Sequence, residues 1–320
     1  MNTFPELDEL LSFKQLRLPQ VRFEVLGSVS TGGREYPIQS LVIGAEDKSL
    51  PTFGLFGGVH GLEKVGSQII IAFLKTFFHQ LSWDQDLVKS LEQFRIVSIP
   101  IINPGGMANS TRCNPSGVDL MRNAPVEADA GLGYPLISGH RLSPRLPWYR
   151  GQGAELELES KVLVEFVREQ MFHAELALCL DVHSGFGVKD QIWYPYARSK
   201  KDYPFRPQTL KLKELLDTTY PHHIYKFEGQ ADNYITSGDL WDFLLDEYQA
   251  SSMTSATVFL PLTLELGSWN WIRKNPVQFF SKLGLFHPMK QHRHSRIMRR
   301  HLLLLDLLIR AVKNHKIWMK

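Results

Sequence analysis

Apolar positions along the chain recur with two different periods, which predicts strands that alternate with helices. Val21 to Leu26 and Tyr36 to Ile43 partly alternate apolar with polar residues around Ser30-Thr31-Gly32-Gly33, the pattern of a β-hairpin. The apolar, glycine-rich run from Pro51 to Val59 predicts a buried strand. The stretch from Lys64 to Leu81 that follows has the spacing of an amphipathic helix.

The same alternation continues through the middle of the chain. Arg95 to Ile102 and Leu176 to Val182 predict buried strands, and Glu155 to Met171 has helical spacing. Asn103 to Arg150 predicts a loop rich in Gly, Pro and Asn, and a loop this long in a compact domain is usually functional. Strands separated by helices favour the α/β class, here a three-layer α/β/α arrangement around a twisted, mostly parallel mixed sheet. Ligands in such folds bind beyond the carboxyl ends of the strands.

Length and composition are those of a folded protein with a sizeable core. The chain has 320 residues, of which 43% are hydrophobic, and α/β folds of this size commonly form one unit. We expect a single domain over residues 1–320, with a short N-terminal leader at 1–19 and a basic C-terminal helix at 289–320 packed on the domain.

Charge is placed unevenly along the chain. Residues 289–320 contain nine Lys or Arg and one Asp, a net charge of +8, so the rest of a chain with net charge +3 carries −5. A solvated basic helix face is the preferred interpretation, and contact with an anionic surface is the alternative. Since no nucleic-acid-binding motif accompanies the charge, we expect no nucleic-acid partner.

The compartment is predicted from weak signals. Two cysteines, Cys113 and Cys179, are too few for a disulfide scaffold, and Met1 to Arg17 lacks the apolar core of a signal peptide. No stretch approaches the roughly 18 apolar residues of a membrane span. We therefore expect a cytoplasmic protein without a membrane span.

The segment His60-Gly61-Leu62-Glu63 carries the first sign of chemistry, because it joins the predicted strand to the helix that follows. An imidazole and a carboxylate three residues apart at such a turn can both reach one cation, and ligands of this kind suit zinc. The pattern alone also fits an ordinary turn histidine beside the first Glu of a helix.

Three further segments bear on that choice. Thr111 to Asn123 follows Asn103-Pro104-Gly105-Gly106 and contains two arginines and an aspartate. Leu180 to Gly185 delivers His183 at the end of an apolar strand. Leu262 to Gly267 carries one carboxylate among hydrophobic neighbours.

Taken singly, these residues have simpler interpretations. Arg112 and Arg122 would be ion-pair residues of a loop, Asp181 a carboxylate that binds backbone amides, and His183 a core histidine. Glu265 is harder to dismiss, because an unpaired carboxylate in a buried strand costs several kcal/mol unless something compensates it.

Taken in order, the HxxE, the NPxG, the GVDLxR with its preceding arginine, the strand-end His and the TLELG resemble the zinc carboxypeptidase family, peptidase family M14. The resemblance covers roughly residues 20 to 285. It includes Tyr149-Arg150-Gly151 followed by Glu157-Leu158-Glu159, similar to that family's entry into a helix.

The resemblance implies one zinc ion bound by His60, Glu63 and His183, with a fourth position left for water. It implies Glu265 as the general base, a role that an upward shift of pKa by desolvation would suit. Arg112 matches the arginine that stabilises the oxyanion of the tetrahedral intermediate.

The resemblance also implies how the substrate is held. Arg122 matches the residue that grips a terminal carboxylate, and Asp119 matches the carboxylate that orients the first histidine. Met121 stands where the family usually has Asn, and methionine cannot donate a hydrogen bond. Half of the usual clamp is therefore missing unless Asn123 or another donor replaces it.

A capping tyrosine is implied by Tyr234-Ile235-Thr236-Ser237-Gly238 followed by Trp241-Asp242, which resembles the family's YxxSG...DW stretch. Tyr234 is the preferred match. Tyr248 is the alternative, although it lies closer to Glu265 in the sequence than the family's usual spacing. The specificity pocket is then expected near Asp239 to Trp241.

These matches predict a zinc-dependent metallocarboxypeptidase-type hydrolase that cleaves a peptide or amide bond near a free carboxylate, by zinc-activated water with Glu265 as general base. One alternative is an N-acyl-amino-acid deacylase that resembles aspartoacylase and succinylglutamate desuccinylase. A non-catalytic zinc-containing binding protein is another. The expected partner is a peptide or amino-acid-conjugate substrate, and substrate identity and oligomeric state stay open.

Overall fold

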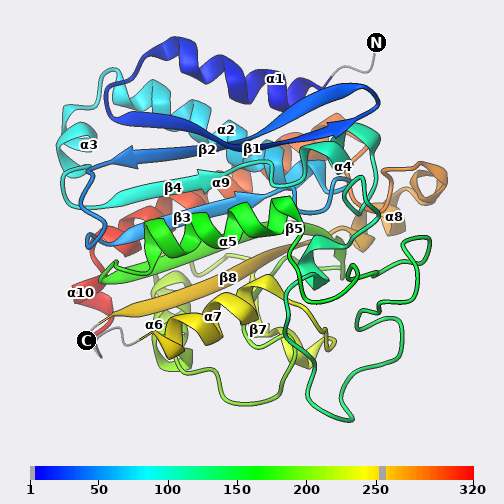
Figure 1. Cartoon of the computed structure of the whole chain (residues 1–320). Helices are drawn as coiled ribbons and strands as arrows, with labels where there is room; N and C mark the ends of the chain where they lie inside the picture. The colour runs from blue at the N-terminus through cyan, green and yellow to red at the C-terminus, as the bar shows by residue number, and fades with distance from the viewer. Residues whose placement is uncertain (1–3, 252–256) are drawn as a thin grey trace.

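A computed structural model describes residues 4–251 and 257–320, which are built around one eight-stranded sheet (Figure 1). The strand order is β1-β2-β4-β3-β5-β8-β6-β7. The strands are β1 (Val21–Thr31), β2 (Arg34–Gly44), β3 (Thr52–Gly57), β4 (Arg95–Ile99), β5 (Leu176–Phe186), β6 (Gln191–Tyr194), β7 (Lys226–Gly229) and β8 (Val258–Gly267). The α-helices are α1 (Pro5–Ser12), α2 (Lys64–Leu81), α3 (Gln85–Ser90), α4 (Pro104–Asn109), α5 (Leu158–Met171), α6 (Arg206–Thr219), α7 (Leu240–Ala250), α8 (Trp269–Lys274), α9 (Gln291–Lys313) and α10 (His315–Trp318).

The centre of the sheet is parallel, and an antiparallel pair joins it to the strands on either side. Strands β4, β3, β5 and β8 run parallel to one another, whereas β2 pairs antiparallel with β4 and β6 pairs antiparallel with β8. Every residue of β3, β4 and β8 is buried, as expected for parallel strands covered on both faces. The predicted α/β class with a mixed, mostly parallel sheet is confirmed.

Helices cover both faces of the sheet, which gives the predicted three layers. Figure 1 shows α5 and α7 in front of the sheet, with α2 and α9 behind it. Helices α2 and α9 contact each other and the central strands β3 and β5, while α5 contacts α7, and α7 contacts β8. The observed α2 has the bounds that the apolar spacing predicts.

The predicted hairpin forms, with strands longer than the alternation indicated. Its turn is Gly32-Gly33, and both residues have positive φ, +58° and +74°. A two-residue hairpin turn of the kind that matches strand twist needs such backbone angles, which glycine adopts without strain. The chain therefore reverses here within two residues.

The two ends of the chain contribute to the fold. Helix α9 buries an apolar stripe that includes Leu304, Leu305 and Leu308, so this C-terminal helix packs on the sheet. The stretch predicted as a leader instead contains α1, whose Leu7 and Leu10 are buried and which packs on α2. A helix this short is stabilised chiefly by such tertiary packing, which its local sequence does not reveal.

Within the described residues, no helix is long and apolar enough to cross a membrane. The candidate functional residues lie at the carboxyl ends of the central parallel strands.

A candidate metal centre and its cavity

Two central strands and one strand-to-helix turn deliver polar side chains to the same end of the sheet. His60 follows β3, and Glu63 is the residue immediately before α2. His183 lies in β5 directly opposite Glu265 of β8 in the parallel register. Because the carboxyl ends of parallel strands meet at one edge of a sheet, residues more than 200 positions apart become neighbours.

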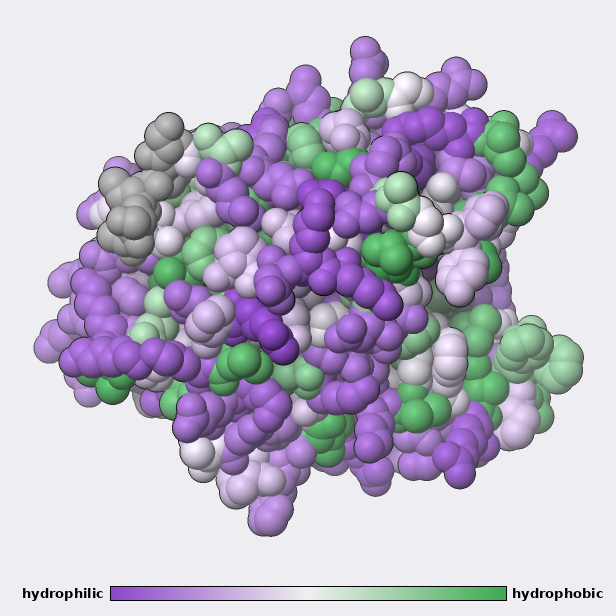
Figure 2. Space-filling model, turned by 90° about the horizontal axis from the view of Figure 1, so that it is seen from below, coloured by the Kyte–Doolittle hydropathy of each residue, from purple (hydrophilic) through white to green (hydrophobic). Residues whose placement is uncertain are grey.

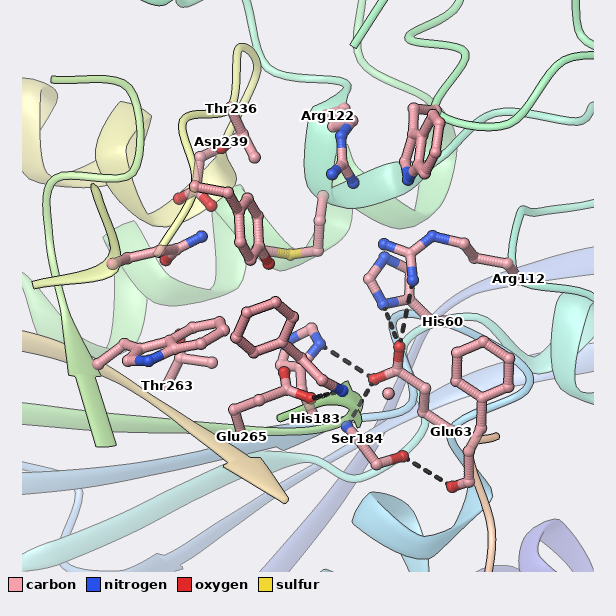
Figure 3. Close-up of a pocket in the computed structure, with 18 of the residues that line it drawn as sticks. His60, Glu63, Arg112, Arg122, His183, Ser184, Thr236, Asp239, Thr263 and Glu265 are labelled. Carbon is pink, nitrogen blue, oxygen red and sulfur yellow. Dashed lines mark hydrogen bonds and ion pairs between the residues drawn. The ribbon is translucent and has the colours of Figure 1, made fainter. Parts of the chain in front are cut away.

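The predicted ligands His60, Glu63 and His183 converge. One ligand atom from each lies within 4.8 Å of the others, and all three residues are buried. Nδ1 of His60 is 2.8 Å from Oε1 of Glu63, and Nδ1 of His183 is 3.2 Å from Oε2. Figure 3 shows both imidazoles directed at the Glu63 carboxylate.

The other nitrogen of each imidazole faces a buried carboxylate. Nε2 of His60 is 3.0 Å from Oδ1 of Asp119, and Nε2 of His183 is 2.8 Å from Oδ2 of Asp181. A neutral imidazole that donates its Nε2 proton to a carboxylate presents a lone pair at Nδ1. Two such lone pairs and the Glu63 carboxylate then face one another, and a cation relieves their repulsion. The donor set therefore fits a divalent metal, and its N and O atoms suit zinc.

Electrostatics agree with a site built for positive charge. Burial acts to raise the pKa of Glu63, but His60 and His183 outweigh it and hold the pKa well below its usual range. Burial acts to lower the pKa of His183, yet Asp181 and Glu63 raise it well above the ordinary value. Since a negative field favours a proton on His183, the same field would favour a metal ion.

Asp119 joins three functional groups. It is fully buried and accepts hydrogen bonds from Nε of Arg112 and Nη1 of Arg122, each at 2.9 Å, besides its contact with His60. Burial would raise its pKa, but the two arginines hold the pKa well below the usual range. The carboxylate stays charged, and one side chain sets the positions of an imidazole and two guanidiniums.

Asp181 plays the matching part for His183. Its Oδ2 contacts His183 and accepts a hydrogen bond of 2.9 Å from Nε1 of Trp241. The alternative that Asp181 binds backbone amides does not describe these contacts. The indole of Trp241 packs on Phe56 instead of facing the cavity, so only Asp239 of the expected Asp239–Trp241 pocket stretch lines it.

Glu265 lies beside the three ligands and is 5% exposed. Burial and the Glu63 carboxylate raise the pKa of Glu265 to about 8, against attraction from His183 and Arg112. Its Oε1 accepts a hydrogen bond of 2.9 Å from the backbone N–H of Phe186, which holds the side chain in place. A carboxyl with a raised pKa is suited to move a proton near neutral pH.

The two predicted arginines enter the same cavity, which has a volume of about 410 Å³. Nη1 of Arg112 lies 3.4 Å from Oε1 of Glu63, so this guanidinium borders the metal centre. Arg122 is 5% exposed, and its Nε has no hydrogen-bond partner within the described part of the chain. Figure 3 shows its guanidinium directed into the cavity, where it could receive an anionic group.

Met121 and Asn123 have different environments in the structure. Met121 lines the cavity. Asn123 is completely buried away from it: its Nδ2 donates to the carbonyl oxygens of Arg150 and Glu155, and its Oδ1 accepts from the N–H of Glu157. The expectation that Asn123 binds substrate is therefore corrected, because its amide already ties loop segments together.

Tyr234 lines the cavity, and its ring packs on Phe186 and Trp193 at centroid distances of 5.4 and 5.6 Å. Burial raises the pKa of its hydroxyl. Tyr248 lies in the core, where its hydroxyl donates to Oγ1 of Thr257 at 2.6 Å. Of the two candidates, Tyr234 has the position of a group that can meet a substrate.

Several cavity residues escaped the sequence reasoning. They are aromatic or polar side chains from separate segments: Trp148, Phe186, Trp193, Gln230, Thr236, Thr263 and Phe286. Thr263 could have been found, because residues two apart in a strand point to the same side, and Glu265 was already singled out. The others come from loops and turns, from the end of β5 and from the short strand β6, which carry no local signal of the cavity.

The backbone of Gly238 packs closely against the backbone of Arg122. Its φ is +78°, and a Cβ there would lie 1.9 Å from the carbonyl oxygen of Arg122. We expect Gly238→Ala to lower the free energy of unfolding by about 2–5 kcal/mol, the sum of backbone strain and overpacking. Urea denaturation measures this loss.

Gly153→Ala is the matched control for that experiment. Gly153 has almost the same φ, +77°, but no described atom lies within 4 Å of its added Cβ. It should show the backbone strain alone, about 1–2 kcal/mol. Equal losses in the two variants would mean that the contact with Arg122 is unimportant.

Comparison with known proteins places these observations in context. The family model described as zinc carboxypeptidase matches residues 15–270. Bovine carboxypeptidase A1 is 26% identical over 245 residues, which are 69% of this chain and 55% of that protein. Human carboxypeptidase A1 is 24% identical over 269 residues, or 79% of this chain and 58% of that protein. This chain therefore spans little more than half of either relative.

Other relatives are named as inactive. The inactive metallocarboxypeptidase ECM14 of Arthroderma otae is 24% identical over 169 residues, 50% of this chain and 28% of that protein. Among solved structures, thrombin activatable fibrinolysis inhibitor matches with a TM-score of 0.64 at 18% identity, covering 92% of this chain and 74% of that one. Carboxypeptidase A from Helicoverpa armigera matches with a TM-score of 0.58 at 21% identity, covering 82% and 64%. The structural matches confirm the fold.

Proposed function

The chain belongs to the zinc carboxypeptidase family, and from this premise we propose that it is a zinc-dependent hydrolase that cleaves a peptide or amide bond near a free carboxylate. The observation that carries the proposal is the convergence of His60, Glu63 and His183 beside the buried Glu265. A binding protein has no need of a buried carboxyl held beside this ligand cluster, and burying one is costly.

The metal centre and Glu265 divide the chemistry between them. When bound by His60, Glu63 and His183, a zinc ion supplies the charge that polarises a carbonyl and lowers the pKa of water. Glu265 then accepts the proton of the attacking water and returns it to the leaving nitrogen. Burial raises the pKa of Glu265 above its ordinary value, which suits a group that takes up a proton and then gives it back.

The arginines supply the remaining charges. Arg112, which borders Glu63, is placed to donate to the oxygen that becomes negative in the tetrahedral intermediate. Arg122 also lines the cavity and is the candidate partner for a substrate carboxylate. Both guanidiniums are bonded to Asp119, so both are oriented before the substrate arrives. Tyr234 is the group that would cover the bound substrate.

The proposal is tested by offering purified zinc-loaded protein matched peptides with free and amidated C-termini, acyl-amino acids and cell-wall γ-D-glutamyl peptides. We expect cleavage of at least one substrate with a free carboxylate and much slower cleavage of its amidated counterpart. Cleavage of acyl-amino acids alone would assign a deacylase. Binding without turnover of any substrate would assign a non-catalytic protein. Relatives named as inactive metallocarboxypeptidases give this outcome a precedent.

Met121 lies where it can contact the substrate carboxylate or the substrate group next to it. If the cavity wall beside Arg122 receives an apolar group, Met121→Asn removes packing and leaves a buried amide unpaired, a cost of about 1–3 kcal/mol. We expect kcat/KM for the best free-acid substrate to fall roughly five- to a hundredfold. Comparing free-acid and amidated peptides in both proteins measures this effect.

The opposite result is equally clear. If Arg122 alone grips the carboxylate, the new asparagine adds a charge-assisted hydrogen bond worth roughly 1.5–3 kcal/mol. Free-acid peptides would then improve by tenfold or more, with amidated peptides unchanged. That outcome would contradict an apolar role for Met121.

A further inference from the structure

A basic and aromatic segment, residues 269–290, projects from the end of the molecule next to the cavity. It begins with α8, which Figure 1 shows beyond the ends of the central strands. The apolar side chains of Val277, Phe279, Phe280 and Met289 are 75, 57, 88 and 50% exposed. Single exposed apolar residues are ordinary, but several within one short segment mark a surface that contacts something.

Hydrogen bonds within the segment hold the conformation in which these apolar side chains are exposed. The amide of the buried Gln278 donates to the carbonyl oxygens of Gly284 and His287, at 2.6 and 2.8 Å. A Cβ on Gly284 would lie 1.6 Å from the carbonyl oxygen of Gln278, so the closure requires glycine there. Phe279 and Phe280, whose ring centroids lie 5.8 Å apart in edge-to-face contact, directly follow Gln278 in this closed loop. Their phenyl rings are thus held outward.

Charge in this part of the chain has one sign. Residues 266–305 contain no Asp or Glu and eight Lys or Arg: Arg273, Lys274, Lys282, Lys290, Arg293, Arg296, Arg299 and Arg300. The first four lie within residues 269–290, and all four are exposed. Exposed phenyl rings with exposed cations on both sides in the sequence fit a partner that offers both an apolar interior and negative charge.

The segment also forms part of the cavity wall. The side chain of Phe286 lines the cavity, and its carbonyl oxygen accepts a hydrogen bond of 2.8 Å from Oγ of Ser184, next to His183. Figure 2 shows the molecule hollowed at its right-hand edge, with hydrophobic residues on both rims. A partner bound at Phe279 and Phe280 would therefore lie on a segment that also forms part of the cavity wall.

We propose that residues 269–290 dock on an anionic lipid surface, with Phe279 and Phe280 at the boundary of the acyl chains and the lysines and arginines among the headgroups. Aromatic insertion and basic flanks are the two signals that together hold a protein at such a surface. Nucleic acid would use the cations and could stack on the rings, but it gives no role to the aliphatic Val277 and Met289. A second copy of the chain would bring a patch of the same charge.

The test is sedimentation of the full chain with vesicles of phosphatidylcholine, with and without about one third phosphatidylglycerol. We expect binding to the anionic vesicles only, weakened by salt. Phe279→Ser with Phe280→Ser should reduce the apparent affinity by roughly tenfold or more, because it removes the apolar insertion. Lys274→Glu with Lys290→Glu should reduce it by a similar factor.

The matched control is Trp83→Ser with Lys89→Glu, which removes an exposed aromatic ring, 67% exposed, and an exposed cation far from the segment. Affinity for the vesicles should be unchanged. The proposal is overturned if wild type ignores anionic vesicles or if the segment variants bind them as well as wild type. It is also overturned if the segment variants abolish self-association or oligonucleotide binding while vesicle binding is absent. Far-UV circular dichroism and thermal unfolding confirm that each variant is folded.

Discussion

His183→Ala is expected to remove most of the bound zinc and nearly all hydrolysis. His183 supplies one of three converging ligands, and its Nδ1 lies 3.2 Å from the Glu63 carboxylate. Substituting a residue that merely orients a ligand typically costs 10–100-fold in metal affinity, so deleting the ligand itself should cost more than about a hundredfold. Elemental analysis after dialysis against a weak chelator measures the retained zinc.

Two companions make that result interpretable. His79→Ala removes an exposed histidine of α2 that lies outside the cavity, and it should retain stoichiometric zinc. Asp181→Asn leaves His183 in place but weakens the carboxylate that faces its Nε2, so it should give an intermediate loss of about 10–100-fold in affinity. Stoichiometric zinc in His183→Ala would exclude His183 as a ligand.

Glu265→Gln should keep the zinc and the fold but lose on the order of 10² to 10⁴ in turnover. The amide has nearly the same shape as the carboxyl and can still face the N–H of Phe186, yet it cannot accept a proton from water. The single-turnover rate with the best substrate from the peptide screen measures the chemical step, and zinc content and urea denaturation are followed alongside.

The control for this substitution is Glu92→Gln, the same chemical change at an exposed position far from the cavity. It should leave turnover unaltered. Turnover of Glu265→Gln within a few fold of wild type would rule out the general-base role. A wild type that holds zinc but shows no turnover at all would instead favour the non-catalytic alternative.

Much of the architecture follows from local patterns. The apolar spacing over Lys64 to Leu81 predicts α2 with its observed bounds, because an 18-residue amphipathic stretch carries several turns of consistent signal. The hairpin around Gly32-Gly33 is equally local, since two glycines between alternating segments suffice for it. His60, Glu63, His183 and Glu265 could be singled out because each stands at an end of such an element or interrupts its apolar run.

Other parts of the fold were invisible to those patterns. Strands β6 and β7 have four residues each, too few for a period to stand out, and they form only because β8 offers β6 an edge to pair with. Helix α1 lies in the stretch predicted as a leader, and its packing on α2 is what stabilises it.

The sequence by itself determined the longer elements such as α2 and the β1–β2 hairpin, the order of the polar groups and their likeness to one family, because these depend on residue types and short spacings. Only the tertiary structure decided what each group touches: Asp119 bridging His60 to two arginines, Trp241 turned to Asp181, and Asn123 withdrawn into loop contacts. The physical reason is that hydrogen bonds and burial depend on distances in space. Partners such as His183 and Glu265 are brought together by strand pairing across many residues, which no local pattern contains.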